Sequence, residues 1–206
     1  MTQYNKTAGE MPMKWQQQKS QATREKILRA SLICLERDGF HNLSLARVAS
    51  EADVSKGALT HHFSNKDELI TLAMEVLLAE FVETLQVAVN DVHAGRMSVD
   101  DCLDEIWRIM SGQLYMVTLE IVLKARHEAE FKSALVPLVR HFHIRLNDIW
   151  QQLFPELAPE RAQALMNLTM NLLRGMGTQS VFREDRSYFN ELLTTWKEIL
   201  AQQLAR

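Results

Sequence analysis

The chain has 206 residues, of which 47% are hydrophobic and 24% charged, and a formal net charge of −3. That length is enough for one large domain or two small ones, each with a buried core. With only four prolines and seven glycines, and no run of alternating apolar and polar residues, the composition argues against a strand-rich protein and predicts an all-α fold.

Cysteine usage and hydropathy predict a cytoplasmic protein. Cys34 and Cys102 are too few and too far apart for a disulfide framework or a zinc site, so we expect two buried thiols in a reducing compartment. No signal peptide is apparent. The most apolar run, 114–123, contains Glu120 and is too short to cross a bilayer.

Charge is distributed unevenly along the chain. Residues 1–66 contain 10 Lys and Arg against 6 Asp and Glu, whereas residues 67–206 contain 13 against 20. A basic first third joined to an acidic remainder suits a protein that presents one end to phosphate groups.

The first elements are an arm and a helix. Residues 1–21 are polar and lack periodicity, which predicts a flexible N-terminal arm. A helix is predicted from Arg24 to Asp38, with Gly39 at the position where a helix end favours a left-handed residue. The apolar positions predicted to be buried are Ile27, Leu28, Ala30, Leu32, Cys34 and Leu35.

Residues 43–66 have the pattern of a helix-turn-helix. Ser44 can cap a short helix whose apolar residues Leu45, Val48, Ala49 and Ala52 form one stripe. Residues 53–54 interrupt that pattern. Ser55 can then cap a second helix, in which Leu59 and Phe63 face inward and a polar face is left for the major groove.

This stretch resembles the DNA-binding motif of the TetR family of bacterial transcriptional regulators. The matching residues are Ser44, Val48, Ala49, Ala52, Val54, Ser55, Gly57, Leu59, His62, Phe63, Lys66 and Leu69. Asp53 stands where the family has a turn glycine, and Asp tolerates the left-handed conformation better than most residues. Thr60 stands in place of a tyrosine that contacts phosphate in the family, so this contact is either missing or moved to His61.

The resemblance implies a DNA-binding domain at residues 22–66. It implies that Ser55, the Gly57 backbone and Lys66 hold phosphates. Because they face outward on the second helix, Lys56, Thr60 and His61 are expected to read base edges and Ala58 to contact a thymine methyl group. The full set of expected DNA-binding residues is Ser44, Ser55, Lys56, Gly57, Ala58, Thr60, His61, His62 and Lys66.

Residues 67–206 read as amphipathic helices that form a helical effector-binding and dimerisation domain. A long helix from Lys66 to Val92 has no Gly or Pro break and should join this domain to the helix-turn-helix. Further helices are predicted at 99–111, 113–127, 130–154, 159–182 and 187–204, with Pro155 and Pro159 between two of them.

A ligand pocket is implied because TetR-like bodies hold one between these helices, and methionine is common in adaptable pockets. The residues expected to bind an effector are Trp107, Met110, Leu114, His127, Phe131, Phe142, Met166, Met170 and Arg174. Plain hydrophobic core is the alternative for the apolar members. Arg174 would need an acidic partner, either in the fold or on an acidic ligand.

The last two predicted helices are apolar over much of their surface, which predicts an isologous four-helix dimer contact. The sequence as a whole predicts a homodimeric, ligand-responsive repressor of a pseudo-palindromic double-stranded DNA operator, released by a small apolar or amphipathic effector. One alternative is a DNA-binding dimer without an effector. The other is a helical-bundle enzyme, which the absence of any catalytic spacing disfavours. No cofactor, metal site or membrane partner is expected.

Overall fold

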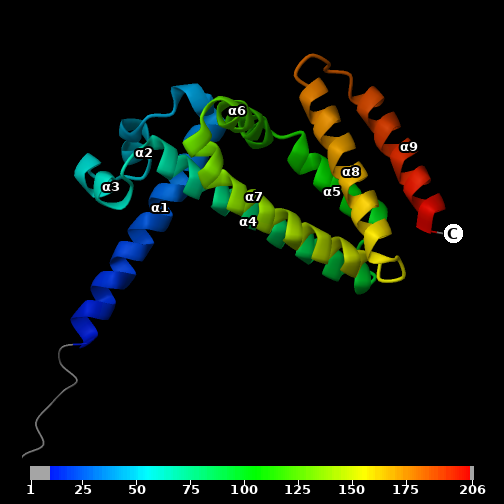
Figure 1. Cartoon of the computed structure of the whole chain (residues 1–206), viewed down its shortest axis with the longest axis horizontal. Helices are drawn as coiled ribbons and strands as arrows, with labels where there is room; N and C mark the ends of the chain where they lie inside the picture. Colours follow the sequence, from blue (N-terminus) through cyan, green and yellow to red (C-terminus); the bar gives the residue numbers. More distant parts are fainter. Residues whose placement is uncertain (1–9, 205–206) are drawn as a thin grey trace, which may run out of the picture. The chain divides into compact units, whose positions relative to one another are not determined.

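A computed structural model describes residues 10–204 (Figure 1). Within that range the chain forms nine helices and no strand, which confirms the all-α prediction. The helices are α1 (Glu10–Asn42), α2 (Leu45–Glu51), α3 (Lys56–His62), α4 (Lys66–His93), α5 (Val99–Met110), α6 (Gln113–His127), α7 (Ala129–Leu153), α8 (Pro159–Gln179) and α9 (Arg186–Leu204).

The chain divides into two compact units, Met1–Val76 and Leu77–Arg206. The boundary lies inside α4, ten residues beyond the 66/67 boundary expected from sequence. The reason is that Leu69, Ile70 and Ala73, in the first turns of α4, are fully buried and belong to the first unit.

In the first unit, which we call the head, α1 supports the helix-turn-helix. All six α1 residues predicted to be buried are buried. Gly39 has φ 76°, so the regular helix ends where the sequence predicted. Phe40 and Leu43 then return to the head core, where they join Val48 of α2 and Leu59 of α3 as buried residues.

The predicted start of α1 was wrong. The helix begins at Glu10 and not at Arg24, so residues 10–21 are helical where a flexible arm was expected. Residues 1–9 of that arm lie outside the described part of the chain. Amphipathic periodicity marked only the packed portion of α1, because every side chain from Trp15 to Ala22 is exposed and carries no apolar stripe.

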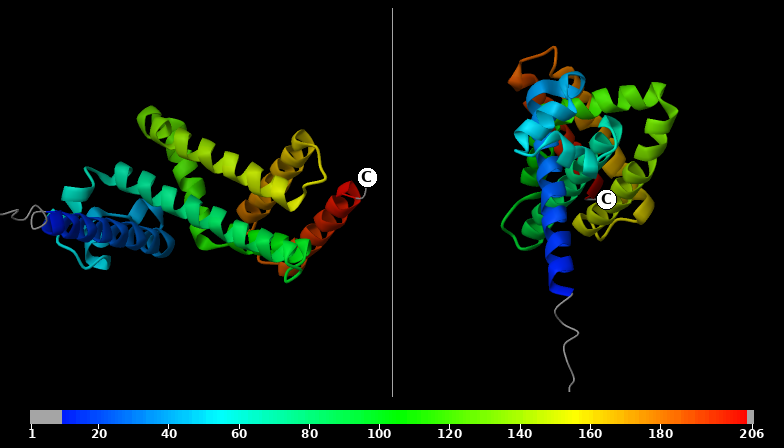
Figure 2. Two further views of the ribbon diagram at one scale, coloured as in Figure 1. Left: turned by 90° about the horizontal axis from the view of Figure 1, so that it is seen from below. Right: turned by 90° about the vertical axis from the view of Figure 1, so that its left-hand side faces the viewer.

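The second unit, which we call the body, contains α5–α9 and the rest of α4. Its helices match the predicted ranges to within three residues at each end. Several contacts hold neighbouring helices together. Gln86 of α4 donates to Gln152 of α7 at 2.8 Å, and α8 and α9 run side by side, joined by a Trp196–Thr169 hydrogen bond of 3.1 Å (Figures 1 and 2).

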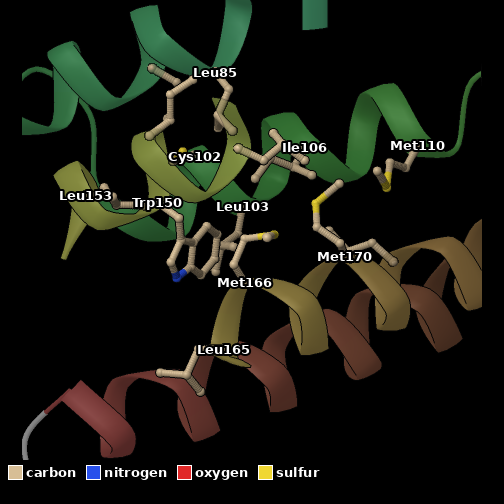
Figure 3. Close-up of a cluster of buried hydrophobic side chains, with 14 of the residues drawn as sticks. Leu85, Cys102, Leu103, Ile106, Met110, Trp150, Leu153, Leu165, Met166 and Met170 are labelled. Atoms are coloured by element: carbon tan, nitrogen blue, oxygen red, sulfur yellow. The ribbon is translucent and has the colours of Figure 1, made fainter. Parts of the chain in front are cut away.

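The body core is built of interlocking apolar side chains from α4, α5, α7, α8 and α9. Trp150, with 1% exposure, packs among Leu103, Met166 and Leu153 (Figure 3). On α5, Ser98 and Asp101 form a capping box, with Ser98 accepting from the Asp101 N–H at 3.0 Å.

The two thiols lie in different cores, Cys34 in the head and Cys102 in the body, and both are free and fully buried. Burial raises the pKa of both thiols, that of Cys102 to about 11.

Among the described helices, none has the length and apolar character needed to span a membrane.

Candidate nucleic-acid interface and ligand site

Two serine caps fix the helix-turn-helix, as the sequence predicted. The Ser44 hydroxyl accepts from the Arg47 N–H at 3.3 Å, and the Ser55 hydroxyl accepts from the Ala58 N–H at 3.1 Å. Asp53, between the two helices, has φ 47° and therefore adopts the left-handed turn conformation proposed for it. Both predicted caps and the turn are confirmed.

Helix α3 presents one open face. Lys56, Gly57, Thr60 and His61 are exposed and recur at helical spacing, while Leu59 on the opposite side is fully buried. Ala58 is half-buried beside that face. The Thr60 hydroxyl donates back to the Lys56 carbonyl at 3.0 Å, so its methyl group and oxygen lone pairs remain for an outside partner.

Among residues 10–204, none has an atom that would require Gly57 to be a glycine. A Cβ at this position would meet no atom closer than the Ser55 hydroxyl, 3.9 Å away. Glycine in a helix costs about 1 kcal/mol relative to alanine. A glycine is therefore unfavourable for helix stability here. Its lack of a side chain on an exposed helix face fits close approach by another molecule.

Two predicted DNA-binding residues also have partners in the head. Lys66 is half-buried, and its Nζ donates to the Phe40 carbonyl at 3.0 Å above the Phe40 ring. His62 is half-buried as well. Burial, followed by the nearby charges of His61 and Arg24, lowers the pKa of His62. These residues anchor α3 and α4, and their contact with phosphate stays a prediction.

The predicted effector residues do not form one pocket. Met110, Phe142, Met166 and Met170 are at least 93% buried in the body core, so for these four the alternative of plain hydrophobic core holds. Figure 3 shows Met110, Met166 and Met170 in that core. The others are dispersed: Phe131 is buried under Lys124, Leu114 is half-buried and His127 is exposed at the end of α6.

Trp107 lines a pocket with different neighbours. Its ring packs on that of Phe189 at 5.5 Å between centroids, and the half-open pocket beside it has a volume of about 340 Å³. The rest of its lining is polar and comes from the end of α5, the α8–α9 turn and the start of α9.

Arg174, the ninth predicted residue, lies in a polar group that sequence reasoning missed. Burial raises the pKa of Tyr115 and lowers the pKa of His143, and the Arg174 charge is the second influence on both. Tyr115 packs against Gly177, where a Cβ would be 3.0 Å from its ring. The Arg174 guanidinium donates to Asn171 Oδ1 at 3.4 Å, and its charge acts on one titratable side chain of α6 and one of α7.

Two buried polar atoms without a hydrogen-bond partner lie on the face of α7 that also carries His143. Asn147 Oδ1 and Trp150 Nε1 are buried without a hydrogen-bond partner. His143, Asn147 and Trp150 recur at i, i+4 and i+7, a spacing that could have identified the stripe from sequence. Unpaired buried polar groups are rare in proteins and are candidates for ligand contacts.

Helices α8 and α9 leave apolar surface uncovered. Leu168 is 55% exposed on α8, and Ile199 is 41% exposed on α9. On α8, Gly175 lies two turns after Leu168 and is exposed, and a Cβ there would meet no atom within 4 Å. Gly177, by contrast, is needed internally, because its Cβ would lie 2.5 Å from the Met110 carbonyl oxygen.

Known proteins with similar sequences are transcriptional regulators. Residues 27–73 match the family described as bacterial regulatory proteins, tetR family. The HTH-type transcriptional regulator CymR of Pseudomonas putida is 22% identical over 93% of this chain and 95% of its own length. The nicotine-responsive transcriptional repressor HdnoR of Paenarthrobacter nicotinovorans is 32% identical over 42% of this chain and 45% of its own length.

Solved structures of this fold include a TetR transcription regulator from Haloarcula marismortui. It superimposes with a TM-score of 0.66 at 19% identity, covering 86% of this chain and 96% of that one. The likeness therefore extends through the body as well as the head.

Proposed function

Because residues 27–73 match the tetR family of bacterial regulatory proteins, we propose that this chain is a homodimeric repressor of that family, released from its operator by a small effector. It is a DNA-binding transcriptional regulator and not an enzyme. The observation that carries the proposal is the open face of α3, with an exposed glycine that the protein itself does not need.

On DNA, α3 enters the major groove. Ser55 and the Gly57 backbone meet phosphates at the start of the helix, where unpaired N–H groups favour anions. Lys56, Thr60 and His61 reach base edges from the exposed face. Lys66 also contacts phosphate from the start of α4, where its ammonium group donates to the Phe40 carbonyl.

The dimer forms through α8 and α9. Leu168, Gly175 and Ile199 supply an apolar surface with a place for close helix approach, and two copies of this pair make a four-helix contact. Two heads then meet two half-sites of a pseudo-palindrome, which compensates for the weak binding of one short recognition helix. Occupation of an operator blocks transcription, the activity stated in the name of HdnoR.

The effector is an amphipathic acid that enters the body between α6, α7 and α8. Its carboxylate pairs with Arg174 near Tyr115 and His143, and a polar group on the ligand pairs with Asn147 Oδ1 or the Trp150 indole N–H. Its apolar part displaces methionine side chains of the adjacent core. Binding requires local opening of that core, and it favours the state that does not bind DNA.

DNA binding is tested by selecting operator sequences from a random duplex library with the full chain. We expect a palindromic sequence, and we expect His61→Ala to alter preference at one base pair per half-site by about 1–3 kcal/mol. Lys66→Ala should weaken binding to all sequences and reduce the salt slope by about one. Selection of no sequence would contradict the proposed function.

The effector site is tested with a panel of aromatic and aliphatic carboxylates in an operator-release assay. We expect release by at least one acid, and loss of that response in Arg174→Leu with operator affinity retained. Lys132→Leu, a substitution at an exposed position of α7, is the matched control. Because a carboxylate favours protonated His143, binding should take up a proton and strengthen as pH falls. If the protein binds DNA but no ligand releases it, the alternative of a DNA-binding dimer without an effector holds.

A further inference from the structure

Residues 15–22 of α1 have no role in the packing of the head. From Trp15 to Ala22 every side chain is exposed, around all faces of the helix. Figures 1 and 2 show this part of α1 standing clear of α2 and α3. It also lies outside the family match, which begins at residue 27. A long exposed helix that adds nothing to the core is available for an external partner.

After Glu10, the first residue of α1, residues 11–24 carry charge of one sign only. Residues 11–24 include Lys14, Lys19 and Arg24 and no Asp or Glu, although the whole chain has a net charge of −3. The remaining polar residues are mostly glutamine, whose amides donate and accept hydrogen bonds. Trp15 is 62% exposed, and Lys19 lies over its ring at 5.3 Å. The chemistry fits a polyanion with accessible sugar and phosphate groups.

Contacts further along α1 connect the segment to the DNA-reading helix. Lys26 Nζ is 3.7 Å from the Asp53 carboxylate, in the turn that precedes α3. The Arg24 guanidinium lies 5.7 Å from the centre of the Phe63 ring, at the residue that ends α3. Helix α1 therefore passes close to both ends of α3 at residues 24–26. The exposed residues that precede this point in the chain extend beyond α3.

We propose that the N-terminal third of α1 binds the phosphate backbone of DNA that flanks each operator half-site. This proposal rests on the proposed DNA-binding function. The twelve residues 11–22 span about 18 Å at 1.5 Å per residue. That is the length of about five base pairs, so the protein protects up to that many outside each end of the palindrome. Lys19 contacts phosphate, and Trp15 packs on the sugar-phosphate edge.

The test compares two duplexes, one with the palindrome in long flanks and one trimmed to its last base pair. The full chain should bind the flanked duplex at least tenfold more tightly, which corresponds to about 1.4 kcal/mol. Lys19→Glu should remove that difference and leave the affinity for the trimmed duplex unchanged. Lys132→Glu, which makes the same change of charge at an exposed position of the body, should leave both affinities unchanged.

Tryptophan quenching gives a second measurement. Flanked DNA should protect wild-type protein from acrylamide more than trimmed DNA does. Trp15→Phe should abolish the difference, because Trp15 is the one exposed tryptophan and the other three, Trp107, Trp150 and Trp196, all lie in the body. Equal wild-type affinities for both duplexes would overturn the flank contact alone. An equal loss on both duplexes in Lys19→Glu would overturn it too. Failure of wild-type protein to bind either duplex would overturn the proposed function itself.

Discussion

Glycines at three positions show how one residue type serves opposite purposes. Gly177 is fixed from inside, because the Met110 carbonyl leaves no room for a side chain. Gly57 and Gly175 have free space beside them and lie on open helix faces. Helix propensity alone would favour alanine at both. Their bare backbones therefore fit the DNA contact proposed for Gly57 and the dimer contact proposed for Gly175.

Gly57→Ala should separate stability from function. We expect the free energy of unfolding to rise by about 0.5–1 kcal/mol, because alanine loses less backbone entropy in a helix. Operator affinity should fall about tenfold or more, which corresponds to 1.4 kcal/mol, since the methyl group holds the helix away from phosphate. Urea denaturation and operator titration measure the two effects. Unchanged affinity would show that DNA does not approach this backbone.

Helix α8 has one face buried in the body core and one face exposed. A charge on the exposed face should prevent dimerisation. Leu168→Glu should give a folded monomer, because a carboxylate cannot be buried in an apolar contact without a partner. Val122→Glu makes the same change at a 64% exposed residue of α6 and should remain a dimer. Light scattering distinguishes the two. If the Leu168→Glu variant remained a dimer, the dimer interface would lie elsewhere on the protein.

Helix prediction succeeded where periodicity and caps agreed and failed where burial was absent. The bounds of α6 were predicted to the residue, and the Ser44 and Ser55 caps are as expected, since these signals are local. The first turns of α1 have no core to face, so no stripe marks them. The ligand-site prediction failed for a different reason, since most of the residues expected to bind an effector are core residues. An apolar stripe is the same whether core or cavity lies behind it, and only three-dimensional packing distinguishes them.

At the scale of the whole molecule, α4 is the one helix that belongs to both compact units. A Glu75→Gly/Ala79→Gly variant changes two exposed residues of α4 on either side of the boundary. Each glycine costs helix stability of about 1 kcal/mol. We expect operator and effector each to bind as before, while the effect of one on the other, typically about 1–3 kcal/mol, diminishes.

The measurement is operator affinity with and without saturating effector. Glu75→Ala is the matched control, because it removes the same side chain and retains helix propensity. Undiminished coupling in the double-glycine variant would mean that the signal does not travel along α4.

The buried thiols make this chain convenient for labelling. Cys34 and Cys102 are its only cysteines, both are inaccessible, and the raised pKa of each keeps it protonated at neutral pH. A cysteine introduced on the open face of α3 would therefore take a spin label selectively, without removal of the native residues. In a dimer the two labels would report the separation of the heads, to be compared with about 34 Å for half-sites one DNA turn apart.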